Sequence, residues 1–241
     1  MMLTAFTLVA LSQTTFSDAT LSNESPRNMM LEVKLGSYYP WVDRPLDCTP
    51  GSCPYERVLG GAMLLVEGAV ERQLFQKHGS AALGASFGYA EKYGRAVAED
   101  GSQTSEPTAL RVLPMRIFAT YRWDYAAIKW GVPLVPYVKA GFQLVHWWAT
   151  KGAQTEVAGG GAGAGWSYGI VGTGGLAFQL DVLDRRLARD FDTGMGVNHT
   201  YLFAEFNIAE VNNFGARTST GGPGALDLSA RYFMFGLAFE Y

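Results

Sequence analysis

Charge is scarce in this chain. Asp, Glu, Lys and Arg make up 17% of its 241 residues, whereas roughly 25% is typical of soluble domains. So few charges would cover the surface of a soluble protein of this size poorly. The net charge of −3 is spread along the sequence rather than gathered in one block, which argues against a nucleic-acid partner.

Long hydrophobic runs are also missing. No apolar stretch reaches about 18 residues, so a membrane-spanning helix is excluded by length. The longest candidate, 2–11, has the length of a signal-peptide core, although no Lys or Arg precedes it. We expect 1–19 to be an export signal, 20–28 a periplasmic N-terminal segment, and 29–241 the folded domain. A disordered tail or a misassigned start is the alternative to the export signal.

Cysteine is rare as well: the chain has only Cys48 and Cys53, in the sequence DCTPGSC. The turn at Pro50 and Gly51 could bring the two Cβ atoms within bonding distance. We expect a local disulfide formed in an oxidising compartment; two unpaired thiols are the alternative. Two cysteines without a nearby histidine cannot form a structural zinc site, so we expect neither a metal nor another cofactor.

What the sequence does contain is a repeated alternation with a period of two. Aliphatic or aromatic residues alternate with glycine, serine, threonine and isolated charges in eight segments bounded by turn residues, which predicts eight strands. The predicted strands are 28–39, 62–71, 81–94, 110–124, 136–148, 166–180, 199–210 and 231–241. Segments of about 9 to 11 residues are long enough to cross a bilayer when tilted.

The polar face of these segments is too poorly charged for good contact with water and too charged for a dry core. An apolar face that points outward and a mixed polar face that points inward are typical of a transmembrane barrel, in which lipid covers the apolar face and the lumen is crowded and polar. Long connections follow the first, third, fifth and seventh strands, and aromatics gather near strand ends, as in such barrels. A soluble lipocalin-like binder is the alternative.

We therefore predict an all-β fold: an eight-stranded antiparallel up-and-down transmembrane β-barrel with long outer loops and both termini in the periplasm. The long connection after the sixth strand repeats apolar residues at helical spacing over 183–191, which predicts one short periplasmic helix. An ordered turn is the alternative at this position.

Charged residues on the inward-facing positions form the candidate site. An eight-stranded barrel is just wide enough to be filled by side chains, so opposite charges should pair across it. We expect a charge network of Glu32, Lys34, Glu67, Glu71, Arg116, Arg122, Asp124, Lys139, Glu205 and Glu240. The inward glycines make room, so a narrow channel for ions or small solutes stays as an alternative.

Catalysis is not expected. The histidines are His78, His146 and His199; His199 has Thr200 beside it, but adjacent strand residues point to opposite faces. The glycine-rich stretch 157–165 has the spacing of a phosphate-binding loop, but such a loop must lead into a helix, and a strand follows here. A lipid-modifying outer-membrane enzyme remains the alternative.

Four stretches, SPRNMMLEVKLGSYYP, GVPLVPYVKAG, GVNHTYLFAEF and GLAFEY, resemble a family of small, uncharacterised outer-membrane β-barrel proteins of myxobacteria and related deltaproteobacteria. The resemblance runs from about Ser25 to Tyr241 and implies a fold and a location, the bacterial outer membrane, but no reaction.

The last strand also matches the terminal pattern that outer-membrane barrels present to their assembly machinery. Its residues are Phe233, Phe235, Leu237, Phe239 and Tyr241. We thus expect an outer-membrane protein with a structural or surface-interaction role, whose partners are membrane lipid, the barrel assembly machinery and a surface partner that binds the outer loops.

Overall fold

The computed structural model describes residues 28–44, 48–49, 53–76, 79–97, 103–151, 154–155, 157–158, 161–183, 194–215 and 226–241. The predicted export signal, and all but Asn28 of the segment predicted over 20–28, lie outside these residues. Eight long strands coincide with the eight predicted segments. They are β1 (Met29–Tyr38), β2 (Met63–Gln76), β3 (Ser80–Val97), β4 (Gln103–Arg122), β5 (Leu134–Lys151), β9 (Ala164–Gln179), β10 (His199–Glu210) and β11 (Ala230–Glu240).

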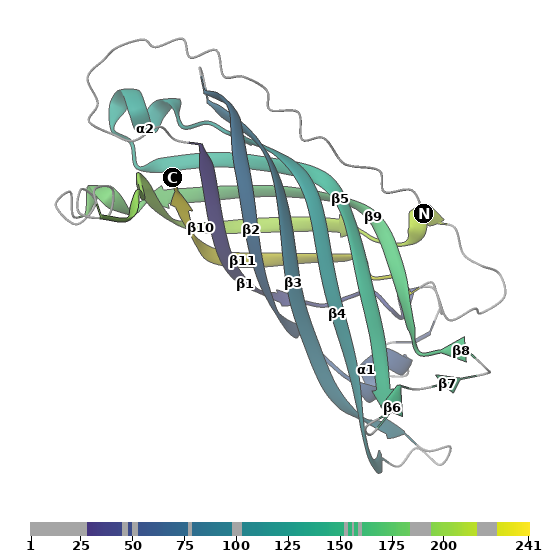
Figure 1. The fold of residues 1–241 in the computed structure, drawn as a ribbon. Coiled ribbons are helices and arrows are strands. Elements are labelled where there is room, and N and C mark those ends of the chain that lie inside the picture. The colour runs from purple at the N-terminus through teal and green to yellow at the C-terminus, as the bar shows by residue number, and fades with distance from the viewer. Residues whose placement is uncertain are drawn as a thin grey trace, which may run out of the picture.

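These strands form one closed antiparallel barrel (Figure 1). Each pairs with its neighbours along the chain, and β1 pairs with β11 from Met30–Glu240 to Gly36–Met234, which closes the barrel. Within this closed part of the barrel each strand therefore has a partner on both sides, as a barrel in lipid requires. The predicted eight-stranded up-and-down transmembrane barrel is confirmed.

Two ends of the barrel are distinguished by their connections. We call the end where β1 begins and β11 finishes the terminal end, and the opposite one the loop end. The loop end carries the β1–β2, β3–β4, β5–β9 and β10–β11 connections, and α2 lies at the terminal end (Figure 1).

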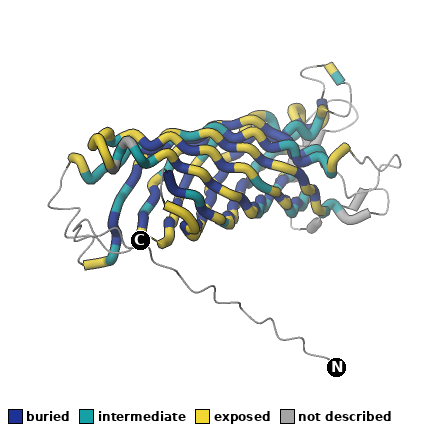
Figure 2. Tube along the Cα trace, turned by 90° about the horizontal axis from the view of Figure 1, so that it is seen from above, coloured by how far each residue is buried: buried dark blue, intermediate teal, exposed yellow. Residues whose placement is uncertain are grey.

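Buried and exposed residues alternate along the long strands (Figure 2), so successive side chains point to the lumen and to the outside. In β4, Ile117 is 63% exposed and Phe118 is 6% exposed. The outward positions are aliphatic or aromatic: Leu64, Phe142, Ile170 and Phe235 are among them. An exterior of this kind suits lipid and would be costly in water, so the predicted apolar outer face is confirmed.

One wall of the barrel is taller than the other. Strands β3, β4 and β5 have 18, 20 and 18 residues, whereas β1 and β11 have 10 and 11. The tall wall arises because β3 and β4 stay paired as far as Val97 and Gln103. The connection between the predicted strands 81–94 and 110–124 is therefore shorter than predicted, because β3 continues to Val97 and β4 begins at Gln103.

Shorter elements fill the other connections. The connection between β5 and β9 contains two-residue strands, β6 (Gln154–Thr155), β7 (Val157–Ala158) and β8 (Gly161–Ala162), where only a loop was predicted. The β1–β2 connection contains α1 (Pro54–Val58), with Pro54 in the first turn, a position that needs no N–H donor.

At the terminal end, α2 (Tyr125–Trp130) lies between β4 and β5, where only a turn was predicted. The helix predicted over 183–191 falls almost entirely on residues that the structure does not describe; the 3₁₀ turn η2 (Leu180–Val182) precedes it. No helix within the described ranges is both long and apolar enough to cross a membrane.

Candidate functional site

The lumen contains a layer of buried charged side chains, which we call the charged belt. Its members come from β1, β2, β4, β5 and β10. In each strand the charged residues alternate with apolar residues that face outward, so the charged side chains point into the lumen. They are Glu32, Lys34, Glu67, Glu71, Arg116, Arg122, Lys139 and Glu205, all at most 5% exposed.

Lys34 lies at the centre of the charged belt. Its Nζ is 2.8 Å from Glu205 Oε1, 3.2 Å from Glu67 Oε1 and 3.8 Å from Glu32 Oε2. An ammonium group carries three donors, and here they face carboxylates from three strands. Such a buried cation is strongly coupled to its partners, because their charges would be uncompensated without it.

Lys139 repeats this arrangement toward the terminal end. Its Nζ lies 2.6 Å from Glu32 Oε2, 2.9 Å from Glu71 Oε1 and 3.9 Å from Glu205 Oε2. Arg122 pairs with the other oxygen of Glu71. Glu32 and Glu205 therefore connect the two lysines, and the belt is one continuous network across the lumen rather than a set of separate pairs.

Arg116 extends the network toward the loop end. It pairs with Glu67 at 3.3 Å and donates to Tyr232 Oη and, at 3.2 Å, to Asn207 Oδ1. Asn207 Nδ2 donates to Glu205 at 3.1 Å, and Thr173 Oγ1 donates to Asn207 Oδ1 at 2.7 Å. These neutral partners were not predicted, although their inward strand phase was available from the sequence.

Two of the expected charges lie apart from the belt. Glu240 accepts hydrogen bonds from the neutral donors Gln73 Nε2, at 2.5 Å, and Tyr201 Oη, at 3.0 Å. Asp124 lies beyond the end of β4, half-buried in the connection to α2, because β4 ends two residues earlier than predicted. Among the described residues, the inward carboxylates Glu32, Glu67, Glu71, Glu205 and Glu240 thus outnumber the four inward cations by one.

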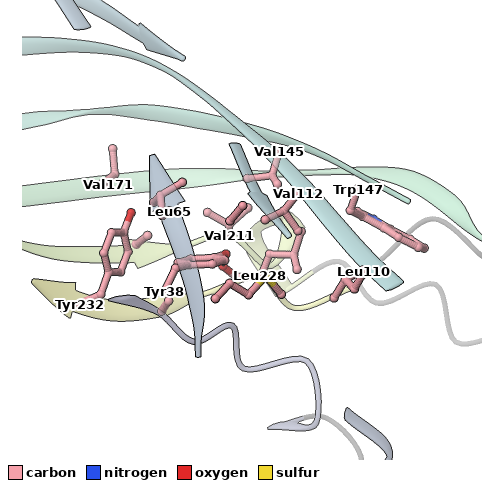
Figure 3. Close-up of a cluster of buried hydrophobic side chains, with 14 of the residues drawn as sticks. Tyr38, Leu65, Leu110, Val112, Val145, Trp147, Val171, Val211, Leu228 and Tyr232 are labelled. Carbon is pink, nitrogen blue, oxygen red and sulfur yellow. The ribbon is translucent and has the colours of Figure 1, made fainter. Parts of the chain in front are cut away.

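A second layer fills the lumen on the loop side of the belt. We call it the outer core, and Figure 3 shows it as a group of aliphatic and aromatic side chains from opposite walls. Leu65, Val112, Val145 and Leu228 are completely buried in it. Tyr38 crosses the layer, donates to Leu228 O at 2.6 Å and packs edge-to-face on Tyr232, whose hydroxyl meets the belt.

A smaller apolar cluster, the inner core, lies at the terminal side of the belt. It consists of Met30, Val135, Tyr137, Ala177, Tyr201, Phe203 and Ala238. Tyr137 Oη donates to Glu205 Oε2 at 3.1 Å, so this cluster also has a polar contact with the belt. The lumen is therefore layered: apolar, charged, apolar.

Large side chains pack against two of the inward glycines, Gly84 and Gly175. A Cβ on Gly175 would lie 2.3 Å from the Tyr137 ring, and one on Gly84 would lie 2.8 Å from the Phe118 ring. Large neighbouring side chains thus occupy the space that these glycines leave. Two cavities beside the belt measure about 10 Å³ each, room for about one water molecule. The space beside these glycines is therefore filled, which does not favour the narrow channel that was kept as an alternative.

Outside the lumen, the structure contains the expected disulfide between Cys48 and Cys53. It lies next to α1, whose first N–H groups need acceptors. Asp43 supplies them: its two carboxylate oxygens accept from Tyr55 N at 2.9 Å and Glu56 N at 3.1 Å. The β1–β2 connection is therefore held at both sides of the helix start.

The predicted assembly residues lie on the outer face of β11. Phe233, Phe235, Leu237 and Tyr241 are exposed, and Phe239 is half-buried. Phe233 also packs on Phe206 of β10, with ring centroids 4.8 Å apart. Their placement matches the lipid-facing phase expected of them.

Of the histidines, His78 lies outside the described residues. His146, at the loop end, stacks on Trp148 and contacts the Trp166 ring at a tilt. His199 Nδ1 lies 2.5 Å from Asp181 Oδ2, and the backbone N–H of Thr200 donates to the other oxygen. The Asp181–His199 pair was not predicted, because Asp181 lies in the turn after β9, where no sequence periodicity marks a residue. A carboxylate that orients an imidazole is one part of a general base. Thr200, however, contacts the Asp181 carboxylate through its backbone N–H, so this contact does not present its hydroxyl group as a nucleophile.

Asp181 lies outside the strands. Partial burial would raise the pKa of its carboxyl group, but hydrogen bonds from His199, Gln179 and the Thr200 backbone outweigh this and lower the pKa. The ionised form is therefore the stable one, and it ties η2 to the start of β10. Within the ranges that the structure describes, no group of His, Cys, Asp or Glu is suited to hold a metal ion.

No family model matches this chain, and no curated protein sequence matches it. Solved structures do. The attachment invasion locus protein Ail of Yersinia pestis aligns over 90% of this chain and 99% of its own, at 9% identity and a TM-score of 0.44. Neisserial surface protein A aligns over 89% of this chain and 97% of its own, at 10% identity and a TM-score of 0.43.

The outer membrane protein OprG of Pseudomonas aeruginosa covers 90% of this chain and 97% of its own, at 8% identity and a TM-score of 0.49. At such values the chains are similar to this one in general outline only. The assignment of the fold accordingly depends on the closed strand pairing and the apolar exterior described above.

Proposed function

We propose that this protein is an integral barrel of a bacterial outer membrane, with a permanently filled lumen and a structural or surface-interaction role. The observation that carries the proposal is the layered lumen, in which the outer core closes the barrel above the charged belt. A lumen filled in this way transports nothing, so interaction with other molecules falls to the loop end and the exterior.

The exterior supports the location. Aromatic side chains lie exposed near both ends of the barrel, among them Trp123 and Trp130 at the terminal end and Trp166 at the loop end. Indole and phenol rings favour the boundary between hydrocarbon and headgroups, and the apolar strand faces between them suit the hydrocarbon. Insertion into liposomes, followed by heat-modifiable migration on gels, tests this part of the proposal.

Orientation is tested by proteolysis. If the loop end faces outward and the termini are periplasmic, trypsin added to intact cells should reach the exposed Arg57 in α1 and not the exposed Lys129 in α2. Both sites should be cleaved after lysis. Cleavage at Lys129 alone in intact cells would show that the barrel has the opposite orientation.

A narrow channel is the second reading of the sequence, and the cavities of about 10 Å³ beside the belt do not favour it. An enzymatic role is likewise not favoured, because no nucleophile among the described residues is positioned against the Asp181–His199 pair. Lipid composition of outer membranes should be the same in cells with and without the protein; an altered acyl or headgroup pattern that depends on His199 would support an enzyme instead.

A further inference from the structure

A surface pocket of about 430 Å³ lies at the loop end, where the chain leaves β1 beside the start of β11. Its lining residues are Tyr39, Pro40, Trp41, Asp43, Arg44 and Arg231. A volume of this size is in the range of small-molecule sites. It is far larger than either cavity beside the belt, and the function proposed above makes no use of it.

Two arginines and an indole ring give the pocket its chemistry. The guanidinium of Arg44 lies 4.8 Å from the Trp41 ring centroid, and that of Arg231 lies 5.5 Å from it. Stacking on an aromatic ring holds a guanidinium group in place while its N–H donors stay available. Paired arginines of this kind suit bidentate recognition of a phosphate or a carboxylate.

Acidic side chains at the pocket compete only weakly with an anionic ligand for Arg44 and Arg231. Both Asp43 oxygens already accept from backbone N–H groups of α1. Arg44 pairs with Glu210 at 3.6 Å, but their side chains are 54% and 37% exposed, so this pair stabilises little. No carboxylate among the described residues lies within ion-pair distance of Arg231.

The pocket wall is fixed by the backbone rather than by loose side chains. Trp41 N donates to Ser229 O at 2.9 Å, which extends the contact between the β1 and β11 segments beyond the last ladder pair. Arg44 N donates to Trp41 O at 3.0 Å, which makes a turn. The two guanidinium groups are therefore presented on a preformed surface, a condition that lowers the entropic cost of binding.

The position of Arg231 indicates where the ligand comes from. Arg231 stands on the outward phase of β11, paired with the exposed Ile208 of β10 and two residues from the lipid-facing Phe233. Its side chain thus emerges at the rim of the apolar exterior. A long arginine at this level can place its head in the headgroup layer while its stem lies along apolar surface.

We propose that this pocket binds the phosphate group of a membrane lipid whose acyl chains lie along the outer face of β11. Arg44 and Arg231 hold the phosphate, Trp41 positions both guanidinium groups, and Phe233 and Phe235 contact the chains. The inference depends on the membrane location proposed above and gives that location a specific lipid partner.

The test uses the full chain inserted into nanodiscs of phosphatidylcholine with increasing amounts of phosphatidic acid, which carries a phosphate monoester. Native mass spectrometry of the released protein measures the retained lipid. Phosphatidic acid should be retained in preference to phosphatidylcholine. Arg231→Gln and Arg44→Gln should each weaken its binding about tenfold, as expected for loss of a charge-assisted hydrogen bond.

Arg57→Gln is the matched control, because Arg57 is an exposed arginine at the same end of the barrel and outside the pocket. It should retain as much phosphatidic acid as the unchanged protein. Equal retention in all four proteins, or equal loss in Arg57→Gln, would overturn the proposal by showing that general charge attraction is responsible.

A second arm separates a lipid from a soluble phosphate. Glycerol 3-phosphate should bind the detergent-solubilised protein far more weakly than phosphatidic acid binds in nanodiscs; equal affinity would overturn the assignment to a lipid. A protein that does not enter nanodiscs at all would contradict the membrane location itself. A protein that enters them but shows no lipid preference would contradict only the pocket inference.

Discussion

The charged belt and the outer core fill the same lumen by opposite means. In the belt, Lys34 and Lys139 each face three carboxylates, whereas Arg116 and Arg122 each pair with one, Glu67 and Glu71. In the outer core, Leu65 and Val112 are excluded from solvent by neighbours in a largely apolar cluster. The belt is therefore sensitive to unpaired charge, and the outer core is sensitive to lost volume.

The largest loss of unfolding free energy is expected from removing one charge of the belt. Lys34→Met would leave the four belt carboxylates facing only three belt cations, Arg116, Arg122 and Lys139, so one buried negative charge would be uncompensated. The free energy of unfolding should therefore fall by about 3–5 kcal/mol. Denaturant unfolding of the barrel in lipid vesicles measures this change.

Lys129→Met in the exposed α2 is the control and should change the unfolding free energy little. Equal effects of the two substitutions would show that the belt ion pairs contribute no special coupling. The belt would then resemble a set of surface charges, and its contrast with the outer core would disappear.

A loss of volume in the outer core should cost somewhat less. Leu65→Ala removes a fully buried side chain and leaves a cavity, which should lower the unfolding free energy by about 3 kcal/mol. Leu64→Ala, one position away on the lipid-facing phase, is the control: lipid fills the space it leaves, so no cavity term arises. A larger loss in Leu64→Ala would reverse the assignment of inner and outer faces.

Adding volume beside the belt should have a smaller effect. Gly175→Val would place atoms against the Tyr137 ring, so overpacking should lower the unfolding free energy by about 1–3 kcal/mol. Gly174→Val faces open space, with nothing within 4 Å of its added Cβ, and should be close to neutral. Similar stabilities of the two variants would mean that the lumen has spare room at this level.

The smallest effect concerns Asp181, outside both layers. Its carboxyl pKa is lower in the folded protein than in the unfolded chain, so the stabilisation is present above the unfolded value of about 3.9. It is lost as the pH falls through the lower folded value. Asp181→Asn should cost under about 1 kcal/mol at pH 7.

The difference in unfolding free energy between Asp181→Asn and the unchanged protein should therefore disappear in acid. Denaturant unfolding of both proteins at each pH measures it, with the unchanged protein as the reference throughout. A difference that grows as the pH falls would contradict the sign given for the shift in the Asp181 pKa.

Much of the barrel could be predicted from sequence because a period of two fixes which face of a strand each residue occupies. Glu32, Lys34 and Glu67 were placed in the lumen by phase alone. Their grouping into one layer could not be predicted in the same way, since it depends on the register between strands, and a shift by two residues preserves the pattern while changing every partner.

Irregular segments were the other source of error. Asp43 acts on α1 and Asp181 acts on His199 from turns, where no periodicity marks a residue as important. The pocket at Trp41 joins residues that are far apart in the chain, Arg44 and Arg231, and only the β1–β11 pairing brings them together. Barrel closure, which no local pattern encodes, therefore creates this site.

The central claim is that the two layers together close the lumen, and ion conductance across a planar bilayer tests it most directly. The reconstituted protein should produce no steady current steps, and neither should Arg116→Ala or Lys139→Ala, because the outer core remains in place above the belt. Reproducible current steps from the unchanged protein, altered in size or ion selectivity by Arg116→Ala or Lys139→Ala, would contradict it.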